Sequence, residues 1–234
     1  MTERILLSHP LRPDSPRWPT NPPAAAVELF ESIARGDVDN NALLHLCSHS
    51  GTHVDTPWHF NPDGPAAWQL PIEAFVFERP RLIDVPTGER ELISQEALEA
   101  QAAAVDSADL LLIRTGWGAL RASDPRRYES DGPVLATDAA RWLIGHDGLR
   151  AIATDAISIG APWNPEVSIE IHHVLTGLGR TDGRFVLIYE DVAMPPDTAR
   201  VTRVHAWPLF IEGSDGSPVT IVAELGDDRP ATSG

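Results

Sequence analysis

The feature that most restricts the fold of this chain is an alternation of apolar runs and helix-like segments between residues 79 and 190. Helical patterns follow Ser94, which would cap a helix through Ala104, and Thr137, which would cap a helix to about His146. Strands that alternate with helices predict an α/β domain. The strand-like runs that these helices separate are RPRLIDV, DLLLIRT, LRAIATD and RFVLIYE.

The two ends of the chain differ from this middle part. The segment SHPLRPDSPRWPTNPP, residues 8–23, is rich in proline and predicts an extended N-terminal arm. Apolar spacing then predicts a helix from Ala24 to Arg35 with Gly36 as its C-cap. Near the C-terminus, RVHAWPLFIEG and SPVTIVAEL predict a pair of antiparallel strands, which would make the sheet mixed. We expect one domain over residues 1–225 and a disordered tail at residues 226–234.

Charge and composition exclude several classes of function. Acidic residues outnumber basic ones 34 to 18, so no basic surface is expected for nucleic acid or for an anionic membrane. No apolar stretch reaches the roughly 20 residues of a membrane span, and no signal peptide is evident at the N-terminus. We therefore expect a soluble, cytoplasmic protein.

The chain contains no lysine and one cysteine. The missing lysine excludes a Schiff base, a P-loop lysine and a Ser–Lys dyad. The single cysteine excludes an intrachain disulfide and any zinc site that needs two or more cysteines. A cysteine hydrolase remains open, because Cys47 lies near His45 and His49 in the strand-like run ALLHLCSH.

The stretch HSGTHVDTPWHF, residues 49–60, is the strongest chemical signal. We expect its part GTHVDTPWHF, residues 51–60, to be irregular, because it contains Gly51 and Pro57. His49, His53 and Asp55 supply imidazole nitrogen and carboxylate oxygen, which are the donors that Zn²⁺ prefers and that Mn²⁺ also accepts. His59 can then stand beside the metal as a general acid or base.

This stretch resembles the H-x-G-T-H-x-D-x-P-x-H signature of the cyclase family of metal-dependent hydrolases, which contains bacterial kynurenine formamidase and isatin hydrolase. Weaker landmarks follow in order: LLSHPLRPDSPRWP is similar to the N-terminal arm of the family, with Leu6 in place of Asp, and LLIRTGW and IATDAISI are similar to later segments. The resemblance implies a single α/β domain with a mixed sheet of the swivelling β/β/α type. It also implies a homodimer or a higher homo-oligomer, for which the proline-rich arm could be the exchanged element.

The same resemblance implies a second metal ion, bridged by Asp55 and bound by a downstream His and Glu. His172 and Glu190 match those positions, in HHVLTGLGRTDGRFVLIYED. The spacing between them is longer than in the family, through the insertion GRTDGR, and Glu190 is followed by Asp191 rather than Asn. The implied site therefore holds one or two zinc ions, with His59 as the catalytic residue.

The expected reaction is hydrolysis of the amide bond of a small aromatic substrate. A bound metal lowers the pKa of its water to about 7, so that hydroxide can attack the amide carbonyl while His59 passes a proton to the departing nitrogen. The resemblance implies N-formyl-L-kynurenine as substrate, in tryptophan catabolism, with an isatin-like lactam or a secondary-metabolism cyclase substrate as alternatives. Trp18, Trp58 and Trp68 could form the wall of an aromatic pocket. A non-catalytic metal- or ligand-binding protein of the same fold is a further alternative.

Overall fold

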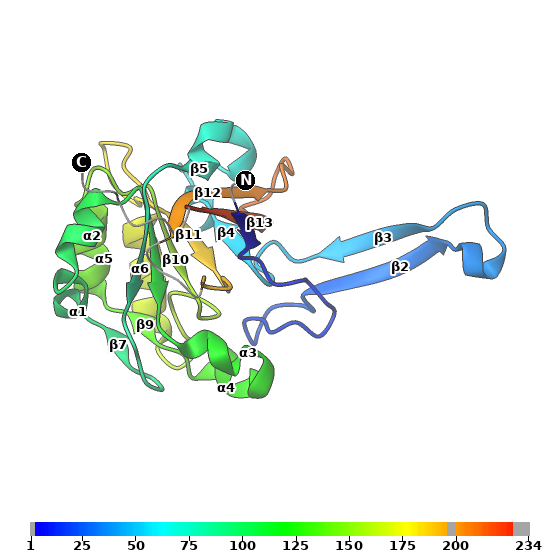
Figure 1. The fold of residues 1–234 in the computed structure, drawn as a ribbon, viewed down its shortest axis with the longest axis horizontal. Coiled ribbons are helices and arrows are strands. Elements are labelled where there is room, and N and C mark those ends of the chain that lie inside the picture. The colour runs from blue at the N-terminus through cyan, green and yellow to red at the C-terminus, as the bar shows by residue number, and fades with distance from the viewer. Residues whose placement is uncertain (1–2, 196–199, 227–234) are drawn as a thin grey trace.

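The computed structural model describes residues 3–195 and 200–226 of the chain and shows one α/β domain with a projecting hairpin (Figure 1). Its strands are β1 (Glu3–Leu6), β2 (Ala25–Glu31), β3 (Asn41–Leu46), β4 (His53–Asp55), β5 (Val76–Phe77), β6 (Pro80–Asp84), β7 (Leu92–Ile93), β8 (Leu110–Arg114), β9 (Val134–Leu135), β10 (Ala151–Thr154), β11 (Leu187–Glu190), β12 (Val201–Pro208) and β13 (Gly216–Leu225).

The main sheet has the strand order β5-β12-β13-β4-β11-β10-β8-β6, and β1 pairs with β13 beside this path. Strands β6, β8, β10 and β11 are parallel to one another. Strands β1, β5, β12 and β13 pair antiparallel, and β4 lies antiparallel between β11 and β13. The predicted α/β domain with a mixed sheet is confirmed, and β4 is the strand at which its parallel and antiparallel parts meet.

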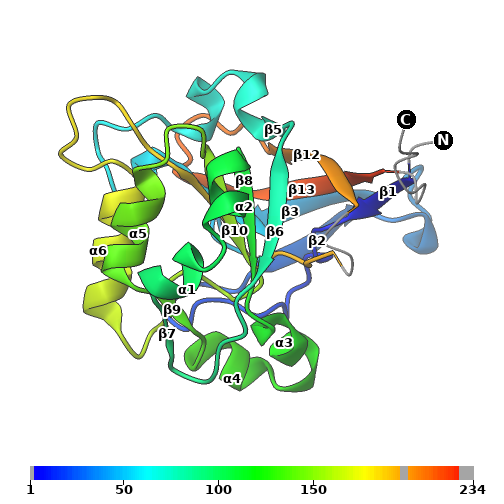
Figure 2. The same cartoon turned by 60° about the vertical axis from the view of Figure 1, so that its left-hand side comes forward.

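The helices are α1 (Gln95–Glu99), α2 (Ala102–Ser107), α3 (Leu120–Ser123), α4 (Pro125–Ser130), α5 (Thr137–Ile144) and α6 (Pro165–Leu175). Helices α1, α2, α5 and α6 lie together against the parallel strands, whereas α3 and α4 lie near the end of these strands (Figures 1 and 2). Right-handed crossovers between parallel strands place such helices on the sheet and bury their apolar sides.

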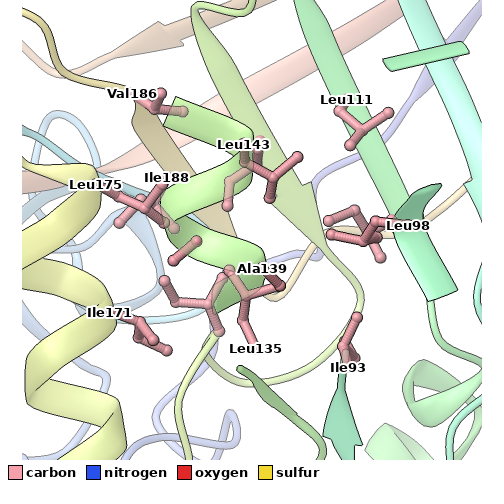
Figure 3. Close-up of a cluster of buried hydrophobic side chains, with 14 of the residues drawn as sticks. Ile93, Leu98, Leu111, Leu135, Ala139, Leu143, Ile171, Leu175, Val186 and Ile188 are labelled. Atoms are coloured by element: carbon pink, nitrogen blue, oxygen red, sulfur yellow. The ribbon is translucent and has the colours of Figure 1, made fainter. Parts of the chain in front are cut away.

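Two hydrophobic clusters use the two faces of the parallel strands. In β8, Leu111 and Ile113 belong to the cluster under the helices, and Leu110 and Leu112 belong to the other cluster. Successive side chains of a strand point to opposite faces, so a strand buried on both faces has consecutive apolar residues, as Leu110 to Ile113 are here. Figure 3 shows side chains of α5 and α6, among them Leu143 and Ile171, packed with those of the sheet.

The predicted helix from Ala24 to Arg35 is wrong. Residues 25–31 form β2, which pairs antiparallel with β3 from Ala25 opposite Leu46 to Glu31 opposite Asn41. Together β2 and β3 form a hairpin that extends away from the rest of the molecule (Figure 1). The helical apolar spacing was overridden because pairing with β3 satisfies the backbone, and local helix propensity is a weak preference. Gly36 still ends a helical turn, the short 3₁₀ segment Ile33–Arg35, at φ 94°.

Three further predictions need correction. The motif segment is not wholly irregular, because His53–Asp55 forms β4, paired on both sides. The helix predicted from Ser94 to Ala104 is two helices, α1 and α2, although Ser94 does accept a hydrogen bond from the Ala97 N–H as its cap. Thr137 is the first residue of α5 rather than its cap.

The remaining element predictions are confirmed. The four apolar runs contain β6, β8, β10 and β11, and the terminal strand pair is β12 and β13. None of the described helices is long and apolar enough to cross a membrane. The predicted tail lies outside the described residues, except for Gly226.

Candidate metal centre

The register of β4 in the sheet determines which side chains meet at the motif. His53 on β4 lies opposite Glu190 on β11, and Asp55 lies opposite Gly216 on β13. Both β4 residues point to one side, because they are two positions apart in a strand. A short 3₁₀ turn, Pro57–His59, follows β4 and carries His59 back toward the same side.

His49 approaches β4 through a tight turn. Gly51 has φ 58°, in the left-handed region that glycine adopts without strain. On the other side of His49, a Cβ atom at Gly216 would lie 2.5 Å from the His49 Cε1 atom. Glycine at these two positions therefore lets the His49 imidazole lie against β4 and β13.

His172 reaches the centre from α6. Ile171 and Leu175 of this helix are buried in the core under the helices, which fixes the helix against the sheet. The insertion GRTDGR does not separate His172 from Glu190, because the His172 Nε2 atom lies 3.7 Å from Glu190 Oε1. Asp191, the other departure from the family pattern, is buried in an ion pair with Arg121 at 2.6 Å.

Asp55 lies at the middle of the cluster. Its Oδ1 atom lies 2.7 Å from His49 Nδ1 and 3.4 Å from His53 Nε2, and its Oδ2 atom lies 3.5 Å from His172 Nε2. Two groups of donor atoms share it: His49, Asp55 and His59 form one, and His53, Asp55 and Glu190 form the other. The structure thus brings together all six predicted residues but groups His53 with Glu190 rather than with His49.

The donor atoms suit a divalent cation. His53 Nδ1–H donates to the Gly51 carbonyl at 2.8 Å, and His172 Nδ1–H donates to the Ser168 carbonyl at 2.5 Å, so both Nε2 atoms face the carboxylates. Backbone partners of this kind orient metal-binding histidines. The His53 Nε2 atom lies 3.3 Å from Glu190 Oε2, and two ligands of one tetrahedral zinc ion would be about 3.3 Å apart.

The charges of the cluster are strongly coupled. Burial by itself lowers the pKa of His49, but Asp55 and Asp215 outweigh it and raise that pKa to about 9. Burial likewise opposes the charge on His172, but Asp55 and Glu190 raise its pKa to about 10. Burial and Asp55 raise the pKa of Glu190, yet His172 and His53 lower it to about 2. The carboxylates therefore stay ionised, which favours a bound cation.

Asp215 is a site residue that the sequence did not reveal. Its Oδ2 atom lies 2.9 Å from His49 Nε2 and 2.9 Å from His59 Nδ1, and its Oδ1 atom accepts a hydrogen bond from Ser48 Oγ–H at 3.0 Å. It precedes β13 in the turn-like sequence EGSDGSP, 156 residues after His59. Nothing about that turn distinguishes Asp215 from the other acidic residues of the chain, so only the pairing of β13 with β4 exposes its role.

Ser158 is a second residue that supports the cluster. Its hydroxyl donates to Glu190 Oε1 at 2.7 Å, and the Ile159 N–H donates to the same oxygen at 2.8 Å. Ser158 belongs to IATDAISI, the segment whose likeness to the family was weak. Its Asp155 accepts hydrogen bonds from Thr115 and so stabilises a neighbouring turn rather than the cluster.

A cavity of about 310 Å³ opens onto all six predicted site residues. Part of its wall comes from the N-terminal arm, through Arg17, Trp18, Thr20 and Asn21, and Phe60, Ile157 and Ile169 add apolar surface. The arm lies on its own domain, where the His9 N–H donates to Thr52 Oγ1 at 2.9 Å. Of the three tryptophans expected in this wall only Trp18 lines it, because Trp58 and Trp68 are partly exposed elsewhere.

The alternative of a cysteine hydrolase loses its geometric basis. In the described residues Cys47 makes no side-chain hydrogen bond to a histidine and does not line the cavity. His45 lies on the hairpin, where its Nε2 atom is 3.6 Å from Glu28 Oε2. His173, the neighbour of His172, belongs to neither group of donor atoms.

The chain is similar in sequence and in fold to several known proteins. The family model described as "Putative cyclase" matches residues 5–161. The kynurenine formamidase of Bacillus anthracis is 29% identical over 218 residues, which cover 93% of this chain and 95% of that protein. Isatin hydrolase A of Labrenzia aggregata has a similar structure, with a TM-score of 0.79 at 22% identity, over 97% of this chain and 94% of that one. A potential metal-dependent hydrolase with cyclase activity also matches, with a TM-score of 0.71 at 19% identity, over 97% and 100% of the two chains.

Proposed function

The chain belongs to the cyclase family of metal-dependent hydrolases, and from this premise we propose that it hydrolyses the amide bond of a small aryl amide. The observation that carries the proposal is the meeting of two donor groups at Asp55, with His59 beside them, in one cavity. A non-catalytic binding protein would not need a histidine held by a carboxylate next to the metal ligands. His59 and Asp215 therefore favour an enzyme.

We propose that His53, Asp55, Glu190 and His172 hold one divalent ion and that His49 and Asp55 contribute to a second one. Two imidazoles with two carboxylates suit Zn²⁺, and Mn²⁺ accepts the same donors. When bound, such an ion supplies a Lewis acid and lowers the pKa of water to about 7. Ser158 and the Ile159 N–H hold the Glu190 carboxylate in place for this role.

His59 is the proposed acid/base residue. Its Nδ1 atom is held by Asp215 Oδ2 at 2.9 Å, which leaves Nε2 to give a proton to the departing nitrogen. Asp215 is a positioning residue, because it fixes the ring orientation and the tautomer of His59 without touching the substrate. The same carboxylate holds His49, so one side chain orients both a proposed metal ligand and the acid/base residue.

N-formyl-L-kynurenine is the proposed substrate, because kynurenine formamidase is a relative over nearly the whole chain. The cavity has a volume suited to one small molecule, and Trp18 and Phe60 offer apolar surface to an aromatic ring. A cyclic aromatic amide is the second candidate, favoured by the likeness in fold to isatin hydrolase A. A biosynthetic cyclase substrate is the third.

The direct test is hydrolysis of N-formyl-L-kynurenine by zinc-loaded protein, followed by the absorbance of kynurenine, with and without a chelator. Turnover that the chelator abolishes and that alkylation of Cys47 leaves intact supports the proposal. Absence of turnover by folded, zinc-loaded protein would exclude this substrate, and the same assay with isatin then tests the second candidate.

We also propose that the protein is a homodimer in which the hairpin is the interface. The facing residues Ala25, Val27 and Leu29 of β2 and Ala42, Leu44 and Leu46 of β3 make one face of the hairpin wholly apolar. The other face carries Glu28 and His45. A two-stranded hairpin with an uncovered apolar face is marginal by itself in water.

A second copy of this chain is the occupant that fits. The large apolar side chains of this face, Val27, Leu29, Leu44 and Leu46, are all exposed, and at roughly 100 Å² each they provide about 400 Å², half of the roughly 800 Å² that one partner contributes to a specific dimer. Each copy has a net charge of −16, so two copies repel each other. An uncharged surface on each copy is therefore the part that can form the contact. A two-fold axis pairs identical patches, so one apolar face suffices.

A further inference from the structure

The guanidinium group of Arg17 lacks the partners that such a group normally has. The backbone N–H of Arg17 donates to Glu129 Oε1 at 3.1 Å, which fixes the arm at this point. The side-chain Nε atom is buried and has no hydrogen-bond partner within the described residues. In that same part of the chain no carboxylate lies within ion-pair distance of this guanidinium.

This isolation is unusual for the chain. Acidic residues outnumber arginines 34 to 18, and other partly buried arginines have side-chain partners: Arg121 pairs with Asp191 at 2.6 Å, and Arg184 donates to backbone carbonyls. A buried donor without a partner is unfavourable, because it has lost its hydrogen bonds to water. A group retained in this state beside a cavity is available to a ligand.

Arg17 lines the same cavity as the metal centre. Among the described residues, it is the one arginine that lines this cavity. The adjacent Trp18 and Phe60 line the same cavity and provide surface for a ring, and the Phe60 ring lies 4.6 Å from that of the proposed ligand His172. A guanidinium group binds a carboxylate through two parallel hydrogen bonds, which fixes orientation as well as charge.

We infer that Arg17 is the carboxylate-binding residue of the substrate site, so that the substrate is an aryl amide bearing a carboxylate group. The inference rests on the proposed hydrolysis of an aryl amide and narrows it, because a neutral cyclic amide would leave Arg17 without a partner. The carboxylate binds at the arm, the ring lies along Trp18, and the amide reaches His59.

The test uses N-formyl-L-kynurenine and its primary carboxamide, which differ in that one carboxylate. With zinc-loaded protein we expect the acid to have the higher kcat/KM. Arg17→Gln should lower kcat/KM for the acid roughly 10- to 100-fold, mainly through KM, and leave the carboxamide nearly unchanged. Arg17→Lys, which keeps the charge but not the planar fork, should recover part of the loss.

Arg12→Gln is the matched control, because Arg12 is an exposed arginine of the same arm outside the cavity. Equal loss with both substrates in Arg17→Gln would assign Arg17 a structural role and overturn the inference. Equal kcat/KM for acid and carboxamide in the wild-type protein would overturn it as well.

Calorimetric binding of the same two compounds to the zinc-loaded protein separates this inference from the proposed function. If neither compound is hydrolysed, the proposed reaction fails, whereas the subsite is still supported when the acid binds more tightly and Arg17→Gln removes the difference. Equal binding of the two compounds, or no binding of the acid, overturns the subsite regardless of turnover.

Discussion

The metal centre and the β2–β3 hairpin reverse the usual distribution of side chains in opposite ways. At the centre, charged and polar residues are buried: His53, Asp55, His172 and Glu190 are each at most 6% exposed. On the hairpin, apolar residues are exposed, and Phe30 reaches 73%. Buried charges need compensation and exposed apolar surfaces need cover, so each region indicates a binding partner: a cation in one case and a second chain in the other.

Removal of a proposed metal ligand should have the largest effect of the substitutions considered, because it acts on the buried charges of the centre. His53→Ala should abolish both metal retention and hydrolysis, because it takes away one donor and leaves Asp55 and Glu190 facing each other. Metal content after desalting and the hydrolysis rate measure the two effects. His173→Ala is the matched control on α6 and should retain both, and retention of metal by His53→Ala would contradict the proposed ligand set.

His59→Ala should separate metal binding from catalysis. We expect the metal to remain and kcat to fall roughly 10²- to 10⁴-fold, because proton transfer to the departing nitrogen is lost. Metal analysis and steady-state kinetics on the same preparation provide the measurement. Unchanged turnover would remove His59 from the mechanism, and loss of metal would make it a ligand.

Asp215→Asn should also lower kcat, but by less than His59→Ala does. The amide keeps the shape of the side chain but holds the His59 ring less well, so we expect roughly a 10- to 100-fold loss in kcat with little change in KM. In combination with His59→Ala, and at equal metal content, the substitution should cost little more in kcat, because the effect of Asp215 on proton transfer passes through His59. Full additivity of the two losses in kcat would show that Asp215 acts independently of His59.

Substitutions in the hairpin should change the oligomeric state of the protein rather than its rate of hydrolysis. Leu44→Glu places a charge on the apolar face and should shift the protein from dimer to monomer in light scattering, with the smallest loss of turnover. Leu43→Glu is the matched control, because Leu43 is similarly exposed, at 54% against 57%, but lies on the face that carries Glu28. A wild-type protein of monomer mass, or an equal effect of both substitutions, would refute the proposed interface.

Prediction from the sequence succeeded where neighbours along the chain carry the signal. The four runs were recognised as strands from their consecutive apolar residues, and the spacing of His49, His53, Asp55 and His59 indicated a metal site within twelve residues. His172 and Glu190 came from the resemblance to the family, and the structure places both in the same cavity.

Prediction failed where a distant segment decides the local structure. Residues 25–31 have helical spacing, yet β3 makes them a strand, because backbone pairing across the hairpin outweighs a weak local preference. The motif segment was expected to be irregular because it contains Gly51 and Pro57, but β11 and β13 on either side make His53–Asp55 a strand.

The sequence by itself determined the chemistry of the centre, because the types and spacing of the donor residues are local properties. The tertiary structure alone decided how these donors are shared and supported. Sheet register places Glu190 opposite His53 and brings Asp215 to His49 and His59, and it depends on strand pairs that are remote in sequence. No local pattern encodes such a register, because it is selected by the burial of both faces of the sheet at once.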